Sequence, residues 1–131
     1  MSERVVRRAV EAFNAHDLDG ILAVADDEIV LRSLLTEADR PLYHGHEGVR
    51  DWFSNVFGVF PDWSPRPRAA SFDEDGSVVI GLDVTATGAG SGARVDQLFW
   101  LGARVEAAKI IFFGFFRTEE DALEAVTSPH T

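Results

Sequence analysis

The sequence contains no cysteine and a single lysine. The absence of cysteine excludes disulfide bonds, thiolate zinc sites, iron–sulfur clusters and cysteine nucleophiles. No apolar run approaches the roughly 18 residues of a membrane-spanning helix. The polar stretch 1–4 does not resemble a signal peptide. We therefore expect a cytoplasmic protein without a membrane partner.

Basic charge is scarce as well. The chain has 12 Lys and Arg against 22 Asp and Glu, so its net charge is −10. Proteins that bind phosphate backbones use clustered cations to displace counterions, so this balance argues against a nucleic-acid partner. Hydrophobic residues make up 46% of the chain and charged residues 26%, which is typical of a folded globular protein. A length of 131 residues predicts one domain over 1–131.

Apolar residues at spacings of three and four predict helices over 4–13, 18–25 and 45–60. Thr118 is a candidate N-cap for a short fourth helix. Stretches rich in β-branched and aromatic residues predict strands between these helices. They cover Ile29–Leu35, Leu42–Tyr43, Ala69–Asp73, Val78–Thr87, Ala93–Val105 and Lys109–Arg117. The order α-α-β-β-α-β-β-β-β-α predicts an α+β fold in which an antiparallel sheet carries its helices on one face.

The last predicted strand is apolar on both faces, since residues 110–116 contain no polar side chain. Leu98–Leu101 on the preceding strand repeats the pattern. A sheet with one solvated face alternates polar and apolar residues, so both faces of this sheet are expected to be covered. We predict a homodimer through the outer face of the last two strands. The alternative is that the terminal helix and loops cover that face.

The element order and the residues that punctuate it resemble the nuclear transport factor 2-like superfamily, and within it the SnoaL-like polyketide cyclase group. The matching stretches are Ala9–Asp17, Tyr43–Arg50, Gly90–Gly92 and Thr118–Val126. The resemblance implies a cone-shaped curved antiparallel sheet wrapped around three helices, with a short C-terminal helix and an enclosed apolar pocket. Where hydrolase relatives carry an acid at the end of the last strand, this chain has Phe116-Arg117-Thr118. That departure argues against their carboxylate chemistry here.

Aromatic residues of the third helix are candidates for lining such a pocket, because aromatic-lined hollows commonly bind ligands. The alternative for each is an ordinary place in the core. Gln97 is the polar member of an alternating apolar set and a candidate hydrogen-bond donor to a ligand carbonyl. The full set of predicted ligand-binding residues is Trp52, Phe53, Phe57, Trp63, Gln97 and Phe99.

Asp83 is our candidate general base, with Tyr43 or His44 as the partner proton donor. The alternation of apolar residues along its strand favours a different reading, in which Asp83 lies on the solvated face. For Tyr43 and His44 the alternative is an ordinary helix start. His44 and His46 lack a further paired ligand group, so we expect no metal, and the sequence indicates no cofactor.

Two functions therefore remain open. The first, implied by the resemblance, is an enzyme that acts on a small hydrophobic carbonyl compound by cofactor-free acid–base chemistry, as an isomerase or cyclase does. The second is a non-catalytic ligand-binding or assembly module of the same fold. An ionisable side chain that points into the cone would favour the enzyme. A wholly apolar cavity would favour the binding module.

Overall fold

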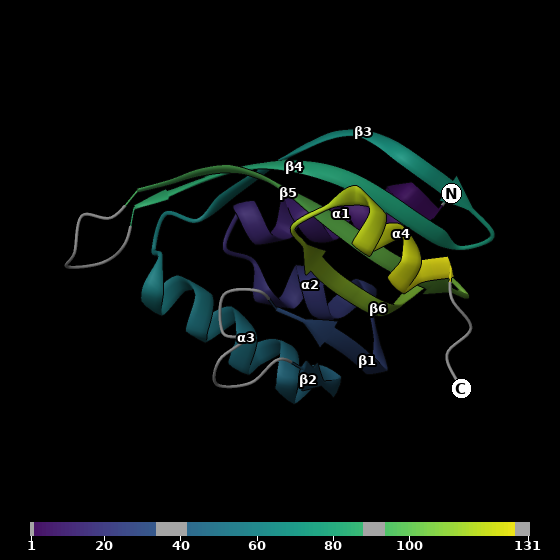
Figure 1. Ribbon diagram of the computed structural model, residues 1–131. Helices are drawn as coiled ribbons and strands as arrows, with labels where there is room; N and C mark the ends of the chain where they lie inside the picture. Colours follow the sequence, from purple (N-terminus) through teal and green to yellow (C-terminus); the bar gives the residue numbers. More distant parts are fainter. Residues whose placement is uncertain (1, 34–41, 88–93, 128–131) are drawn as a thin grey trace.

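The computed structural model describes residues 2–33, 42–87 and 94–127. Four helices and six strands follow one another in the predicted order (Figure 1). The helices are α1 (Ser2–Asn14), α2 (Leu18–Val24), α3 (Gly45–Val59) and α4 (Glu119–Thr127). The strands are β1 (Ala25–Arg32), β2 (Leu42–His44), β3 (Ser64–Glu74), β4 (Ser77–Thr87), β5 (Arg94–Glu106) and β6 (Lys109–Phe116). The matching stretch Gly90–Gly92 lies outside the described residues.

The strands form one curved sheet in the order β2-β1-β6-β5-β4-β3, and its long strands arch over α1 and α2 (Figure 1). All neighbouring strands run antiparallel except β1 and β6, which are parallel. The sheet is therefore mixed at this one pair, a detail that the order of elements along the chain does not specify. The predicted α+β fold, with its curved sheet and short C-terminal helix, is confirmed.

The inner face of the sheet packs on the first three helices. Alternate residues of β4, from Val78 to Ala86, point inward and are at most 3% exposed. They meet the buried stripe of α1, whose members Val6, Ala9, Val10 and Phe13 recur at the predicted helical spacing. This is the main core, and burial of its apolar area drives the fold.

The fourth helix packs on the opposite, outer face, so the prediction that all helices share one face is corrected. Ala122 and Val126 of α4 join Val79 and Phe116 in a second buried cluster. Gly102 makes the contact possible, since a Cβ there would lie 3.1 Å from Val126 Cγ1 and 3.2 Å from the carbonyl oxygen of Ala122. The terminal helix thus covers part of the outer face, as the alternative to a dimer required.

Hydrogen bonds hold both ends of α4. The Thr118 hydroxyl accepts from the backbone N–H of Asp121 at 3.1 Å, as an N-cap does. At the other end, Ser77 Oγ and Arg104 Nη1 each donate to the carbonyl oxygen of Val126 at 2.8 Å. The Arg104 guanidinium also suits the negative end of the helix dipole. The two bonds to Val126 fix the C-terminal end of α4 on the sheet in addition to its apolar contacts.

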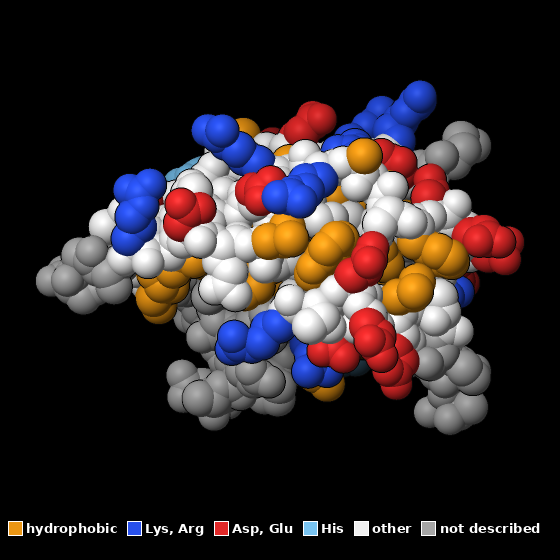
Figure 2. Space-filling model, turned by 45° about the horizontal axis from the view of Figure 1, so that its top comes forward, with side chains coloured by type: hydrophobic (Ala, Val, Ile, Leu, Met, Phe, Trp, Pro, Cys, Tyr) orange, Lys and Arg blue, Asp and Glu red, His pale blue; other side chains and the backbone are white. Residues whose placement is uncertain are grey.

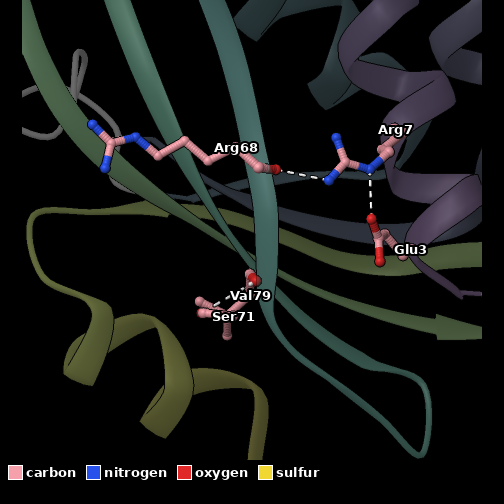
Figure 3. A network of polar contacts seen from close by, with 5 residues as sticks. All are labelled: Glu3, Arg7, Arg68, Ser71 and Val79. Carbon is pink, nitrogen blue, oxygen red and sulfur yellow. Dashed lines mark hydrogen bonds and ion pairs between the residues drawn. The ribbon is translucent and has the colours of Figure 1, made fainter.

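Polar side chains of α1 cover the edge strand β3. Arg7 Nη2 donates to the carbonyl oxygen of Arg68 at 2.7 Å, while Glu3 holds the Arg7 Nε at 2.6 Å (Figure 3). Asn14 Nδ2 donates to the carbonyl oxygen of Pro65 at 2.8 Å. β3 starts five residues before the predicted Ala69 because an edge strand tolerates proline, which lacks an N–H to donate.

Replacing Ser77 by alanine should destabilise the fold by about 1–2 kcal/mol, because it removes one donor from a buried carbonyl and one acceptor from Arg104. Ser71→Ala is the matched control: its hydroxyl lies 3.4 Å from the carbonyl oxygen of Val79 and is exposed, so its loss should change stability by less than about 0.5 kcal/mol (Figure 3). Urea unfolding measures both. Equal losses would contradict a tethering role for Ser77.

Candidate active site

A small cavity lies between α1–α3 and the inner face of the sheet. Its volume is about 20 Å³, enough for one water-sized molecule. Helix residues supply one wall and inward-facing residues of β1, β4 and β6 supply the other. The residues that line it are Ala9, Val10, Phe13, Ile21, Ala25, Ile29, Leu31, Val49, Trp52, Pro65, Leu82, Ile110, Phe113 and Phe115.

Trp52 is the centre of an aromatic cluster on this cavity. Its ring lies 5.2 Å from that of Phe13 and 5.8 Å from that of Phe115, where the two planes differ by 20°. Phe113 meets it edge-on at 6.4 Å. Such offset and edge-on pairs are the favoured geometries of aromatic rings. Trp52 itself is 2% exposed, and its Nε1 has no hydrogen-bond partner among the described residues.

Of the predicted ligand-binding residues, only Trp52 lines the cavity. Phe53 and Phe57 are half-buried in the adjoining layer, where Phe53 meets the Phe13 ring edge-on at 6.1 Å and Phe57 stacks on it at 4.8 Å. Trp63 and Phe99 are buried in a ring pair of their own, 6.2 Å apart and away from the cavity wall. The cavity therefore lies deeper between helix and sheet than the aromatic stripe of the third helix indicated.

Gln97 shares the inward side of β5 with Phe99 but lies near the strand's start, where it is exposed. It does not line the cavity. The sequence analysis missed Phe113 and Phe115, which do. Their alternate spacing in the last strand was a usable signal, but the residues between them are also apolar, so the inward side could not be identified from the pattern.

Asp83 lies on the outer face and not in the cavity, so its placement does not fit a pocket base. Both carboxylate oxygens accept hydrogen bonds from Arg68, each at 2.9 Å. These bonds, together with the positive charges of Arg68 and Arg66, lower the pKa of the Asp83 carboxyl. A general base at neutral pH needs the opposite shift. The space over neighbouring Gly81 is also taken, by the Trp100 ring and the Arg68 stem.

Tyr43 and His44 lie on β2, and three strands separate β2 from β4. Four steps of about 4.8 Å between neighbouring strands put β2 and β4 roughly 19 Å apart along the sheet. The Tyr43 hydroxyl is buried and accepts from Asn55 Nδ2 at 3.0 Å. The His44 side chain is 68% exposed, with Nε2 3.5 Å from a carboxylate oxygen of Glu28. The structure therefore does not bring the three predicted catalytic residues together.

Within residues 2–33, 42–87 and 94–127, no three His, Asp or Glu side chains are close enough to hold a metal ion. His46 Nε2 lies 2.9 Å from the carbonyl oxygen of Ala25 and 3.7 Å from Asp27 Oδ1. None of the described helices combines the length and apolar character that a membrane crossing requires.

Asp83→Asn should lower the urea midpoint at pH 7, and its effect should shrink as the pH falls below about 3.9. The Arg68 pair lowers the folded-state pKa of Asp83, so its contribution to stability is present above the unfolded value of about 3.9. It is lost as the pH falls through the folded value. Asp96→Asn, an exposed carboxylate of β5 without an ion pair in the described part of the chain, is the control. A pH-independent effect of Asp83→Asn would contradict the assignment.

The family model of the SnoaL-like domain matches residues 6–113. No curated protein matches the chain. Among solved structures, a nuclear transport factor 2-like protein of unknown function from Burkholderia pseudomallei is 18% identical, with a TM-score of 0.80 and coverage of 97% of this chain and 98% of its own.

TerC, co-crystallised with polyporic acid, is 15% identical, with a TM-score of 0.78 and coverage of 97% of this chain and 98% of its own. A protein described as a SnoaL-like polyketide cyclase, from Jannaschia, is 15% identical, with a TM-score of 0.76 and coverage of 98% and 93%. At these identities the likeness shows a shared fold. The family match over residues 6–113 shows that the chain belongs to the SnoaL-like domain family.

Proposed function

We propose that this SnoaL-like domain binds a small hydrophobic molecule at the aromatic cavity and performs no acid–base chemistry on it. The observation that carries the proposal is the composition of the cavity wall. None of the described residues that line it has an ionisable side chain. General acid–base catalysis needs such a group within hydrogen-bond reach of the substrate, directly or through one water. The isomerase or cyclase hypothesis lacks that group.

The character of the site supports binding of an apolar ligand. Five of the lining residues are aromatic or proline, and ligand sites are commonly built from such walls with very few polar groups. The structures of similar fold include TerC with polyporic acid and a protein described as a polyketide cyclase. These names favour an aromatic or polyketide-like ligand for the present chain as well. We expect it to act in the cytoplasm.

Ligand entry requires the cavity to widen, because a ring the size of benzene fills a cavity of about 150 Å³. Phe115 is the lining aromatic residue that is only half-buried, and it stacks on Trp52. Rotation of Phe115 away from Trp52 would open the wall toward the surface while the remaining rings stay in place. We infer that Phe115 is the side chain that moves when the ligand binds.

Val49→Ile should weaken binding of ethylbenzene, because the added methylene occupies about the volume of the cavity that Val49 lines. Stability should change by less than about 1 kcal/mol, since the methylene fills a void. Val84→Ile is the matched control. Val84 is equally buried, at 1% exposed, but does not line the cavity, so its variant should lose about 1–3 kcal/mol and keep its affinity for the probe.

Titration followed by heteronuclear NMR measures the affinity, and urea unfolding measures the stability. Saturable binding that Val49→Ile leaves unchanged would contradict the location of the site. No saturable binding by the unmodified chain would contradict the proposed function.

The predicted homodimer would use the part of the outer face beside α4. Leu98 and Trp100 both point to this face and are half-buried. Figure 2 shows hydrophobic side chains in a band across it, between arginines and acidic residues. We expect light scattering to give twice the mass of 14.4 kDa, and Leu98→Arg to give the monomer. If the unmodified chain is a monomer, the homodimer prediction is wrong, and α4 covers the outer face of the sheet without a second copy.

A further inference from the structure

We propose that the ligand carries a neutral acceptor oxygen, such as that of a ketone, ester or ether, which accepts a hydrogen bond from the indole N–H of Trp52. This inference rests on the proposed function, since it specifies the ligand of the same cavity. It begins from Trp52 Nε1, the one buried side-chain nitrogen or oxygen without a hydrogen-bond partner in the described part of the chain.

An unpartnered buried donor is unfavourable, and native proteins leave very few of them. Trp52 could have been satisfied by a single polar neighbour. Instead its ring is surrounded by the phenyl rings of Phe13, Phe113 and Phe115, which offer no oxygen acceptor. Phenylalanine at position 52 would supply an aromatic wall without an N–H. The indole thus keeps a desolvated donor beside an apolar cavity, where an arriving acceptor gains a hydrogen bond without displacing an existing one.

A water molecule is a poor occupant of this site. The cavity is large enough for one, at about 20 Å³. However, a buried water makes two to four hydrogen bonds, and the side chains that line this cavity supply one donor at most. A ligand oxygen attached to an apolar body needs only that one donor. The single N–H therefore matches a molecule with one acceptor better than it matches water.

The acceptor is neutral for an electrostatic reason. None of the described Lys, Arg or His residues lines the cavity. A carboxylate or phenolate would lose its hydration shell and gain one hydrogen bond, which does not compensate an isolated buried charge. The flanking rings favour a flat ligand that can stack between them. The structure thus assigns the ligand to planar, apolar molecules with a neutral carbonyl or ether oxygen.

The test compares acetophenone with ethylbenzene, which have similar shape and differ in the acceptor oxygen. Their hydrophobicity differs as well, so the measured quantity is the ratio of their two dissociation constants, in the unmodified chain and in Trp52→Phe. The hydrophobic difference cancels between the two proteins. Loss of the N–H should raise the dissociation constant of acetophenone, relative to that of ethylbenzene, about five- to tenfold. This is the range expected for one hydrogen bond.

Trp63→Phe is the matched control, because Trp63 is 5% exposed and does not line the cavity. It should leave the ratio unchanged. A second measurement needs no variant and guards against poor folding of Trp52→Phe. In the unmodified chain, the assigned indole N–H proton of Trp52 should move downfield when acetophenone binds, and should not do so with ethylbenzene.

The outcomes separate the two proposals. One outcome overturns the acceptor assignment and leaves the binding function standing. In it, both probes bind, the ratio of their dissociation constants is the same in Trp52→Phe as in the unmodified chain, and the indole proton does not move downfield with acetophenone. If neither probe binds, the binding function itself fails. A changed ratio together with the downfield shift supports both.

Discussion

The fold depends on one constraint, which is that the strands at the centre of the sheet are apolar on both faces. β6 places Phe113 and Phe115 on the inner face and Phe112 and Phe116 on the outer face. Neither set can face water without a large loss of hydrophobic free energy. Helices α1–α3 pack on the inner face of the sheet, and α4 packs on the outer face. The cavity and the covered outer face both follow from this two-sided packing.

The helices and the order of elements were readable from the sequence because each rests on local periodicity. The stripe of α1 and the N-cap at Thr118 need only a few consecutive residues to be recognised. The alternation along β4 likewise favoured an outward Asp83, and the structure places it there, bound to Arg68. The pocket-base interpretation required a bulge at Asp83, but β4 runs in continuous register with β5 past this residue.

Features that depend on distant residues were not readable. The docking of α4 uses Gly102, which lies opposite Gly114 on the adjacent strand, and only the pairing register brings these two glycines together. The parallel pairing of β1 with β6 also depends on residues that are far apart in the sequence. Within β6 the pattern does not indicate which residues face the inner side of the sheet, since every residue from 110 to 116 is apolar or glycine. The cavity wall was therefore assigned to the third helix, where the amphipathic pattern was clear, and to Gln97 and Phe99 of the preceding strand, while the lining residues of β6 were missed.

The described residues that line the cavity carry no ionisable side chain, and this arrangement underlies the binding role that we propose. Tyr43 and His44 do not line the cavity: the buried Tyr43 hydroxyl accepts from Asn55, and the exposed His44 lies beside Glu28. His46 is held by the carbonyl oxygen of Ala25, behind the cavity wall. Trp52 lines the cavity among aromatic rings, and its buried Nε1 has no hydrogen-bond partner in the described part of the chain. Among the described residues of the cavity wall, the indole of Trp52 is the polar side chain, and an indole N–H donates a hydrogen bond without ionising.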